Sequence, residues 1–441
     1  MEIAAPGDIG HNRHPRDRNP VSAEPRTPMT DHSPPPSDGA PTAGTYAIVR
    51  LMASLGLMTI GIVAMYVGVV GLKPIAAEFG ISRGIGSLPY ALFMVGFGVG
   101  SVLHGRIADR YGILIPALIG SVALPAGLIL SAEADSLWQF FAAIALLAGM
   151  LGSSAVFAPM IADVSYWFTG RRGFAVAIVL SGSYFAGAIW PPVLQHLIGE
   201  SGWRSAFATV GYFCLATMMP LCFVLYRKPA HLATARGAPR ESRFMRPLGL
   251  SPNMLQFTIC IAGIGCCVGM SMPQVHIVAH ATDLGFSAQR GAEMLSIMLG
   301  CGIVSRLVSG WISDRIGGLK TLLLGGGLQG VVLAAFLAAD SLTALYIVSA
   351  CFGLSQGGVV PSYAIIVRTF FPAGEAGWRI GMALFFTIFG MALGGWLAGF
   401  LYDLTGSYTV SFINALAFNA MNFLIVALLL TRARLSGAAV K

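Results

Sequence analysis

Apolar runs of about 20 residues follow one another through most of this chain, and they limit its fold more than any other feature. Each run is long enough to cross the hydrocarbon core of a bilayer as a helix. The composition agrees, since the 441 residues are 56% hydrophobic and only 10% charged, with a mean hydropathy of +0.74. Ordinary soluble domains do not have such a composition. The sequence therefore predicts an all-α, multi-pass protein embedded in the lipid bilayer of the cell (plasma or inner) membrane.

Twelve transmembrane helices are expected, in two six-helix bundles joined by one long polar connection. The predicted spans are 47–71, 84–104, 112–131, 137–162, 173–198, 204–226, 254–280, 290–312, 319–338, 342–367, 378–401 and 408–431. The corresponding divisions are a disordered, proline-rich tail at 1–44, a first bundle at 45–226, a basic linker at 227–252, a second bundle at 253–432 and a tail at 433–441.

Charged residues between the spans indicate the orientation. One set of loops carries Arg106, Arg110, Arg171, Arg172, Arg315, Lys320, Arg368 and Arg379, in addition to the basic linker. The opposite loops carry Glu133, Asp135, Glu200, Asp283, Asp340 and Asp403. The positive-inside rule then places the linker and both termini in the cytoplasm. The net charge of +8 follows from these loops, so it gives no sign of nucleic-acid binding.

A short motif recurs in the two predicted bundles. Gly-x-x-x-Asp-Arg-x-Gly occurs at 105–112, after the second span, and again at 310–317, after the eighth span. Each shared residue of the second copy lies 205 residues after its counterpart, and a weaker echo pairs Gly202 with Gly406. Two six-span halves related by a parallel repeat are typical of secondary transporters, whose site lies between the halves near mid-membrane.

The motif, the span count and the basic central linker resemble those of the major facilitator superfamily over about 47–431. The resemblance implies that the motif's Asp and Arg lock the cytoplasmic helix ends while the opposite side is open, and a charge pair at a helix terminus can form and break in this way. The alternative is a set of solvated turns. The residues concerned are Gly105, Asp109, Arg110, Gly310, Asp314, Arg315, Arg171 and Arg172.

Further stretches resemble one branch of that superfamily. Residues 166–175, Tyr-Trp-Phe-Thr-Gly-Arg-Arg-Gly-Phe-Ala, are similar to the fifth-span signature of monocarboxylate transporters and their oxalate/formate relatives. Residues 272–285 resemble the outer end of their seventh span, and Arg306 resembles their eighth-span substrate arginine. The chain departs from the branch in its first span, which lacks an Asp-Gly-Gly-Trp-type opening. The resemblance implies a small organic anion as substrate, a monocarboxylate first.

Arg306 is a charge inside the eighth predicted span, where an arginine costs roughly 3 kcal/mol to insert and marks a functional site by default. A helical wheel places Gly302, Ser309 and Gly310 within about 60° of it, and apolar residues on the far side. Arg306 therefore faces away from lipid. A guanidinium fork matches the two oxygens of a carboxylate. A structural ion pair or a snorkelling side chain is the alternative.

Two histidines share one face of the seventh span. His276 and His280 lie four residues apart, and Asp283 follows on the same face. Because imidazole titrates near neutral pH, the pair could form a proton or substrate gate. They could also be satisfied bundle residues, or bind a metal ion, although no third ligand is visible in the sequence.

Other polar residues form stripes at seven-residue spacing. These are Gln356 and Tyr363 with Ser349 on the tenth span, and Tyr66 with Thr59 on the first span, whereas Tyr184 is a weaker candidate. Such stripes face either a cavity or a neighbouring helix. We consider Tyr66, Gln356 and Tyr363 as substrate-binding candidates beside Arg306.

No clear mid-bilayer Asp or Glu is available to carry a coupled proton. Asp163, near the inner end of the fourth span, is expected to pair with an arginine on the cytoplasmic side. If protons are the coupling ion, the two histidines or the bound acid itself must take part.

The sequence shows no catalytic constellation and no ATP-binding motif, and no cofactor or metal is expected. It predicts a secondary transporter, not an enzyme, that moves a small organic anion by alternating access, as a symporter or an antiporter. One alternative is an exchanger of another small solute in which Arg306 is structural. Another is a transporter-like sensor that binds a ligand without moving it.

Overall fold

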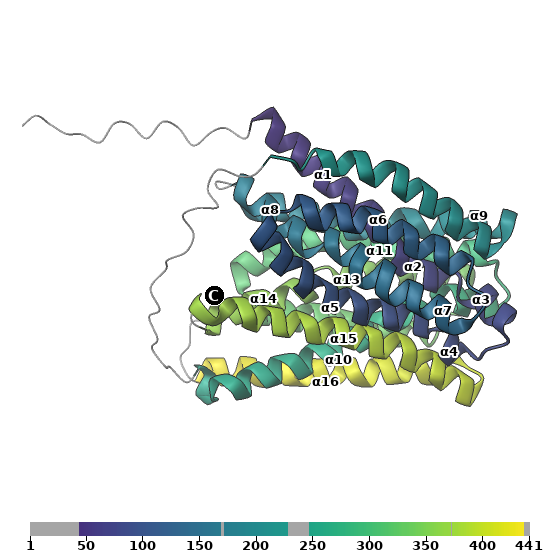
Figure 1. Ribbon diagram of the computed structural model, residues 1–441. Helices are drawn as coiled ribbons and strands as arrows, with labels where there is room; N and C mark the ends of the chain where they lie inside the picture. Colours follow the sequence, from purple (N-terminus) through teal and green to yellow (C-terminus); the bar gives the residue numbers. More distant parts are fainter. Residues whose placement is uncertain (1–43, 169–171, 228–246, 372, 436–441) are drawn as a thin grey trace, which may run out of the picture. The chain divides into compact units, whose positions relative to one another are not determined.

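The computed structural model describes residues 44–168, 172–227, 247–371 and 373–435, and within these ranges every regular element is a helix (Figure 1). Most of the expected N-terminal tail, linker and C-terminal tail lies outside the described residues. The all-α prediction is therefore confirmed for the part of the chain that the structure describes.

The first half runs from α1 to α9. Its elements are α1 (Thr45–Gly61), α2 (Val63–Val70), α3 (Leu72–Phe79), α4 (Arg83–Gly86), α5 (Leu88–Tyr111), α6 (Leu114–Ala132), α7 (Leu137–Ala142), a π-helix (Ala143–Gly152), a 3₁₀ turn (Ser153–Val156), α8 (Ala158–Trp167) and α9 (Arg172–Phe223). The second half runs from α10 to α16. Its elements are a 3₁₀ turn (Pro247–Gly249), α10 (Pro252–Asp283), α11 (Ala288–Ile316), α12 (Gly318–Phe336), α13 (Leu342–Gln356), α14 (Val359–Phe370), α15 (Ala373–Thr405) and α16 (Tyr408–Leu435).

Eleven segments of the described chain are long and apolar enough to cross a membrane. One of them, Ala175–Phe223, has 49 residues, which is more than twice what a bilayer core needs. Gly202 interrupts it with a φ of 79°, a backbone conformation that glycine adopts without steric cost. The interruption falls between the fifth and sixth predicted spans, while the count of twelve spans stays a prediction.

The repeated motif has the same backbone form in both halves. Gly112 ends α5 with a φ of 91°, and Gly317 ends α11 with a φ of 83°. The weaker echo behaves likewise, because Gly202 and Gly406 have φ values of 79° and 69°. Each glycine thus stops a helix in the left-handed region, as glycine commonly does at a helix end. The repeat seen in the sequence is a repeat of helix boundaries.

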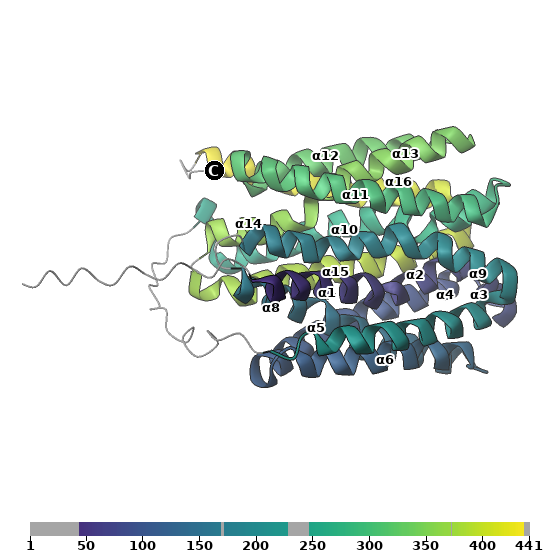
Figure 2. The ribbon, with the colours of Figure 1, turned by 90° about the horizontal axis from the view of Figure 1, so that it is seen from above.

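The helices lie side by side with their axes roughly aligned, as Figures 1 and 2 show from two directions. The start of α1, the end of α9 and the end of α16 lie at one end of this bundle, which we call the linker end. Tyr46 near the start of α1 donates to the carbonyl oxygen of Val224, just after α9, at 2.6 Å. The opposite end, with α3 and α4, is the distal end.

A buried ion pair holds the linker end of the first half. Arg50 of α1 is 1% exposed, and its Nε and Nη2 donate to the two carboxylate oxygens of Asp163 of α8 at 2.7 Å each. Its Nη1 donates to the carbonyl oxygen of Arg227 at 2.9 Å. Asp163 therefore pairs with an arginine as expected, and the partner lies inside the first predicted span.

Breaking this pair should destabilise the protein strongly. Arg50→Ala leaves the buried Asp163 carboxylate unpaired, so we expect a loss of about 3–5 kcal/mol in the free energy of unfolding. Chemical unfolding in detergent, followed by circular dichroism, measures this loss. Arg290→Ala removes an exposed ion pair with Glu293. It is the control, for which we expect almost no change in the free energy of unfolding. Equal stability of the two variants would contradict the assignment.

Candidate functional site

Arg306 lies at the contact between the two halves. Its guanidinium carbon is 4.6 Å from the centre of the Tyr184 ring, which comes from α9 of the first half. Its Nε is buried and has no hydrogen-bond partner in the part of the chain that the structure describes. No carboxylate within the described ranges forms an ion pair with it. The residue is thus a partly buried cation with unused donors, placed where two halves meet.

A glycine on α11 makes room for this contact. A Cβ atom at Gly302, one turn before Arg306, would lie 2.4 Å from Cε1 of Tyr184. The Tyr184 ring therefore packs directly against the backbone of α11. Val304, Val308 and Trp311, on the opposite side of that helix, are exposed, so the arginine faces the interior as the helical wheel predicts.

The backbone at Arg306 packs against the residues where α13 ends and α14 begins. The hydroxyl of Ser305 donates to the carbonyl oxygen of Leu354 at 2.6 Å and accepts from the N–H of Gly357 at 3.1 Å. A Cβ at Gly357 would lie 2.3 Å from the backbone nitrogen of Arg306. This close packing was not predicted from the sequence, because only the fold brings the two segments together.

Tyr66 of α2 packs against α9 beside Tyr184. Its hydroxyl is 3.4 Å from the carbonyl oxygen of Ser183, the residue before Tyr184. A Cβ at Gly187 would lie 2.5 Å from that hydroxyl. We call Tyr66, Tyr184 and Arg306 the arginine cluster. Of these, Tyr184 was only a weak candidate in the sequence, since nothing there shows that it faces α11.

Two other candidates lie within the second half. Gln356 is fully buried, and its side-chain oxygen accepts from the amide of Gln274 at 2.6 Å, whereas its own Nε2 has no partner. Tyr363 is also buried and donates to Asn422 of α16 at 2.9 Å. No hydrogen bond in the described part of the chain joins either residue to the arginine cluster.

The two histidines lie near the distal end and differ from each other. His276 is fully buried, and both of its ring nitrogens are bonded, Nδ1 to the hydroxyl of Tyr408 at 3.0 Å and Nε2 to the carbonyl oxygen of Gly395 at 2.8 Å. His280 is partly exposed, and its Nε2 has no partner. Among the described residues, no hydrogen bond joins either histidine to Arg306.

Cross-half contacts close the distal end around Arg83, at the start of α4. Its Nη2 lies 2.6 Å from the carboxylate of Asp283, which also accepts from Lys73 at 2.6 Å. Asp403 accepts from the backbone N–H groups of Arg83 and Gly84 at 2.8 and 2.6 Å. We call Lys73, Arg83, Asp283 and Asp403 the distal latch. The sequence pattern places Asp283 on the face of the histidines but does not predict this latch.

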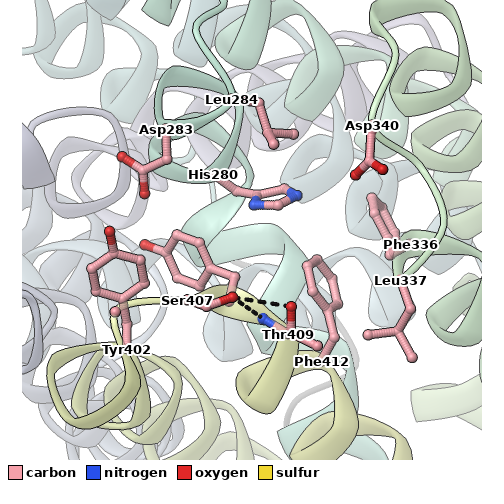
Figure 3. A pocket seen from close by; sticks show the side chains of 12 residues that line it. His280, Asp283, Leu284, Phe336, Leu337, Asp340, Tyr402, Ser407, Thr409 and Phe412 are labelled. Atoms are coloured by element: carbon pink, nitrogen blue, oxygen red, sulfur yellow. Dashed lines mark hydrogen bonds between the residues drawn. The ribbon is translucent and has the colours of Figure 1, made fainter.

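A pocket of about 170 Å³ adjoins the latch within the second half. Figure 3 shows His280 between Asp283 and Asp340, with Phe412 below it. The His280 ring meets the Phe412 ring edge to face, with centroids 5.4 Å apart. The pocket therefore belongs to the distal end and is separate from the arginine cluster.

The predicted gating residues at the linker end show no such closure. Arg110, Asp314 and Arg315 are exposed, and Arg315 lies over the Trp311 ring of its own helix, 3.3 Å from the ring centre. Gly105 and Gly310 have no neighbouring atom within 4 Å of a Cβ position. No ion pair between described residues joins the halves here. Arg171, and the side chains of Asp109 and Arg172, lie outside what the structure describes.

Comparison with known proteins gives matches along most of the chain. The family model for the Major Facilitator Superfamily matches residues 51–336 and 257–439. Monocarboxylate transporter 13 of Rattus norvegicus is 30% identical over 338 residues, covering 76% of each protein. The MFS-type transporter opdF of Penicillium oxalicum is 26% identical over 344 residues, covering 76% of this chain and 78% of that protein.

Solved structures agree on the fold. A bacterial homolog of the human lysosomal transporter Spinster, in an inward-facing and unoccupied conformation, matches with a TM-score of 0.64 at 14% identity. The match covers 89% of this chain and 98% of that one. With the family model spanning most of the sequence, this multi-pass membrane protein belongs to the major facilitator superfamily of transporters, in its monocarboxylate branch.

Proposed function

We propose that the protein moves a small organic anion, a monocarboxylate first, across the membrane by alternating access, with Arg306 as the carboxylate partner. The observation that supports this most is the guanidinium between the halves, which has no ion pair among the described residues and whose buried Nε has no hydrogen-bond partner among them. An unsatisfied buried donor costs about 1–3 kcal/mol. A ligand with a carboxylate would remove that cost.

The chemistry of the cluster suits a monocarboxylate. A carboxylate accepts two parallel N–H bonds from a guanidinium. The described residues offer one free cation at this site, so one carboxylate is the simplest match. The relatives named monocarboxylate transporter 13 and monocarboxylate transporter 11 support the same substrate class.

Alternating access would use twelve spans in two bundles that rock about the arginine cluster. In this scheme the linker end is cytoplasmic, as the basic loops suggest. The distal latch then closes the outer side, and the exposed Arg110, Asp314 and Arg315 belong to an inner side that is not locked. The motif residues would pair when the halves rock the other way.

The coupling ion would be a proton, in symport with the anion, or the exchange partner a second anion. His280 has a free ring nitrogen, whereas His276 uses both of its nitrogens in hydrogen bonds. His280 is therefore the histidine with the capacity to take up a proton without breaking an existing bond. Gln356 and Tyr66 remain proposed contacts for the rest of the substrate.

Removing the guanidinium should abolish high-affinity uptake. For Arg306→Ala in liposomes, we expect kcat/KM for short monocarboxylates to fall about 10- to 150-fold, since a hydrogen bond to a charged group is worth about 1.5–3 kcal/mol. Arg306→Lys keeps the charge but loses the fork, so it should also be impaired. Radiolabelled uptake and counterflow over a panel of short carboxylates measure the effect.

Arg290→Ala, on the same helix but exposed at the distal end, is the matched control and should transport normally. Unchanged uptake by Arg306→Ala would mean that this arginine is structural. Wild-type protein that binds a monocarboxylate without counterflow would instead be a sensor.

Breaking the distal latch should shift the conformational equilibrium. Asp403→Ala removes the acceptor for two backbone N–H groups of α4, so states open at the distal end should become more populated. Nitroxide labels at positions 135 and 290, in a background without the accessible Cys301 and Cys351, report the separation of the halves by electron spin resonance.

We expect longer label separations in Asp403→Ala than in the parent. Glu200→Ala is the control, because the one ion pair of Glu200 among the described residues is with His196 of its own helix. Identical distance distributions in the Asp403 variant and the control would show that Asp403 does not hold the distal end closed.

A further inference from the structure

We infer that Tyr184 of the first half positions the Arg306 guanidinium for the anion and makes anion affinity depend on how the two halves pack. This inference rests on the proposed role of Arg306. It concerns a residue of the opposite half, which contacts the cation and not the substrate, so Tyr184 is a positioning residue.

The tyrosine ring is the main partner of the guanidinium. The guanidinium carbon lies 4.6 Å from the ring centre. Among the described residues, Arg306 has no ion pair, and its buried Nε has no hydrogen-bond partner. A guanidinium is planar, with its N–H donors along the edges. The contact with the ring therefore limits how this planar cation can turn, and donors that have no partner among the described residues stay available for a carboxylate.

Gly302 of α11 leaves the space that the Tyr184 ring occupies. A Cβ at Gly302 would lie 2.4 Å from Cε1 and 2.6 Å from Cδ1 of Tyr184. Any larger residue at this position would displace the ring from α11. Gly302 and Arg306 are one turn apart on the same helix face, so the ring lies across both. The contact is thus a fitted one, in which a glycine on one half receives an aromatic side chain from the other.

The packing next to this space is also close. The hydroxyl of Ser296, which precedes Gly302 on α11, donates to the carbonyl oxygen of Ala188 of α9. A Cβ at Gly187 would lie 2.2 Å from Cδ1 of Leu299. Because α9 and α11 meet this closely, a rocking motion of the halves cannot leave the Tyr184 ring where it is relative to Arg306.

A consequence for transport follows. A transported ligand must bind with different affinities in the two states if its binding is to shift the equilibrium between them. When α9 moves against α11, the ring that orients the guanidinium moves with it. The anion then binds to a guanidinium that is held in one orientation in one state, and to a guanidinium that turns more freely in the other state. Tyr184 would therefore link the position of the halves to the affinity of the site.

Substitution of Tyr184 tests this inference through the KM for uptake. Tyr184→Leu removes the aromatic face, and we expect the KM for monocarboxylate uptake in liposomes to rise about 5- to 30-fold, as for loss of a desolvated cation–π contact. Tyr184→Phe keeps the face and should stay within about twofold of wild type. Tyr212→Leu, in α9 beyond the break at Gly202 and 60% exposed, is the control.

Gly302→Ala tests the same contact from the other half, since the added methyl group should push the ring away and raise the KM in the same way. In an Arg306→Lys background, Tyr184→Leu should add less than about twofold, because a point charge does not need its plane fixed. Thermal unfolding of each variant checks that the effect is not a loss of folded protein.

The results separate this inference from the proposed function. If Arg306→Ala loses uptake but Tyr184→Leu and Gly302→Ala keep the wild-type KM, only the role of Tyr184 is wrong. If Tyr184→Phe is as impaired as Tyr184→Leu, the ring face is not the feature that matters, and the inference falls. If Arg306→Ala transports normally, the proposed function falls first.

Discussion

The contact between the Arg306 guanidinium and the Tyr184 ring joins the two halves of the chain, and no carboxylate among the described residues pairs with this cation. A charge in a membrane protein is tolerated where neighbouring groups stabilise it, and Arg306 has an aromatic face from the other half as its stabilising contact. Arg50 has a carboxylate partner in Asp163. A partner of this kind would occupy the hydrogen-bond donors of Arg306. This contrast between the two arginines is the reason for proposing Arg306, and not Arg50, as the charge that binds a ligand.

The contacts between the halves suit a protein that must change state. At the distal latch, Lys73 and Arg83 both pair with Asp283, and all three side chains are partly exposed. Partly exposed ion pairs contribute little net stability, so they can hold an end closed and still break. The Arg50–Asp163 pair is buried, lies within one half and costs far more to break. The strong pair therefore holds one half together, and the weaker ones join the halves.

The arginine cluster could be predicted from the sequence only in part. Arg306 stands out because a charge in an apolar run is rare, and its direction follows from the helical period. Tyr66 was found by its place in a polar stripe. Tyr184 has a weaker signal, because an aromatic residue in an apolar helix usually packs in the core. The sequence left His276 open as a gate, a substrate contact or a satisfied bundle residue, and in the structure both of its ring nitrogens are bonded within the second half.

The sequence by itself determined the helices, the repeat and the charge inside the eighth span. Apolar length defines a membrane helix, and the repeated glycines end helices through their own backbone freedom. Only the tertiary structure decided the partners: Tyr184 over Arg306, Asp163 beside Arg50, and Arg83 between Asp283 and Asp403. Each of these pairs joins residues that are more than 100 positions apart. Local pattern determines which face a residue occupies, but the packing of whole helices determines what that face meets.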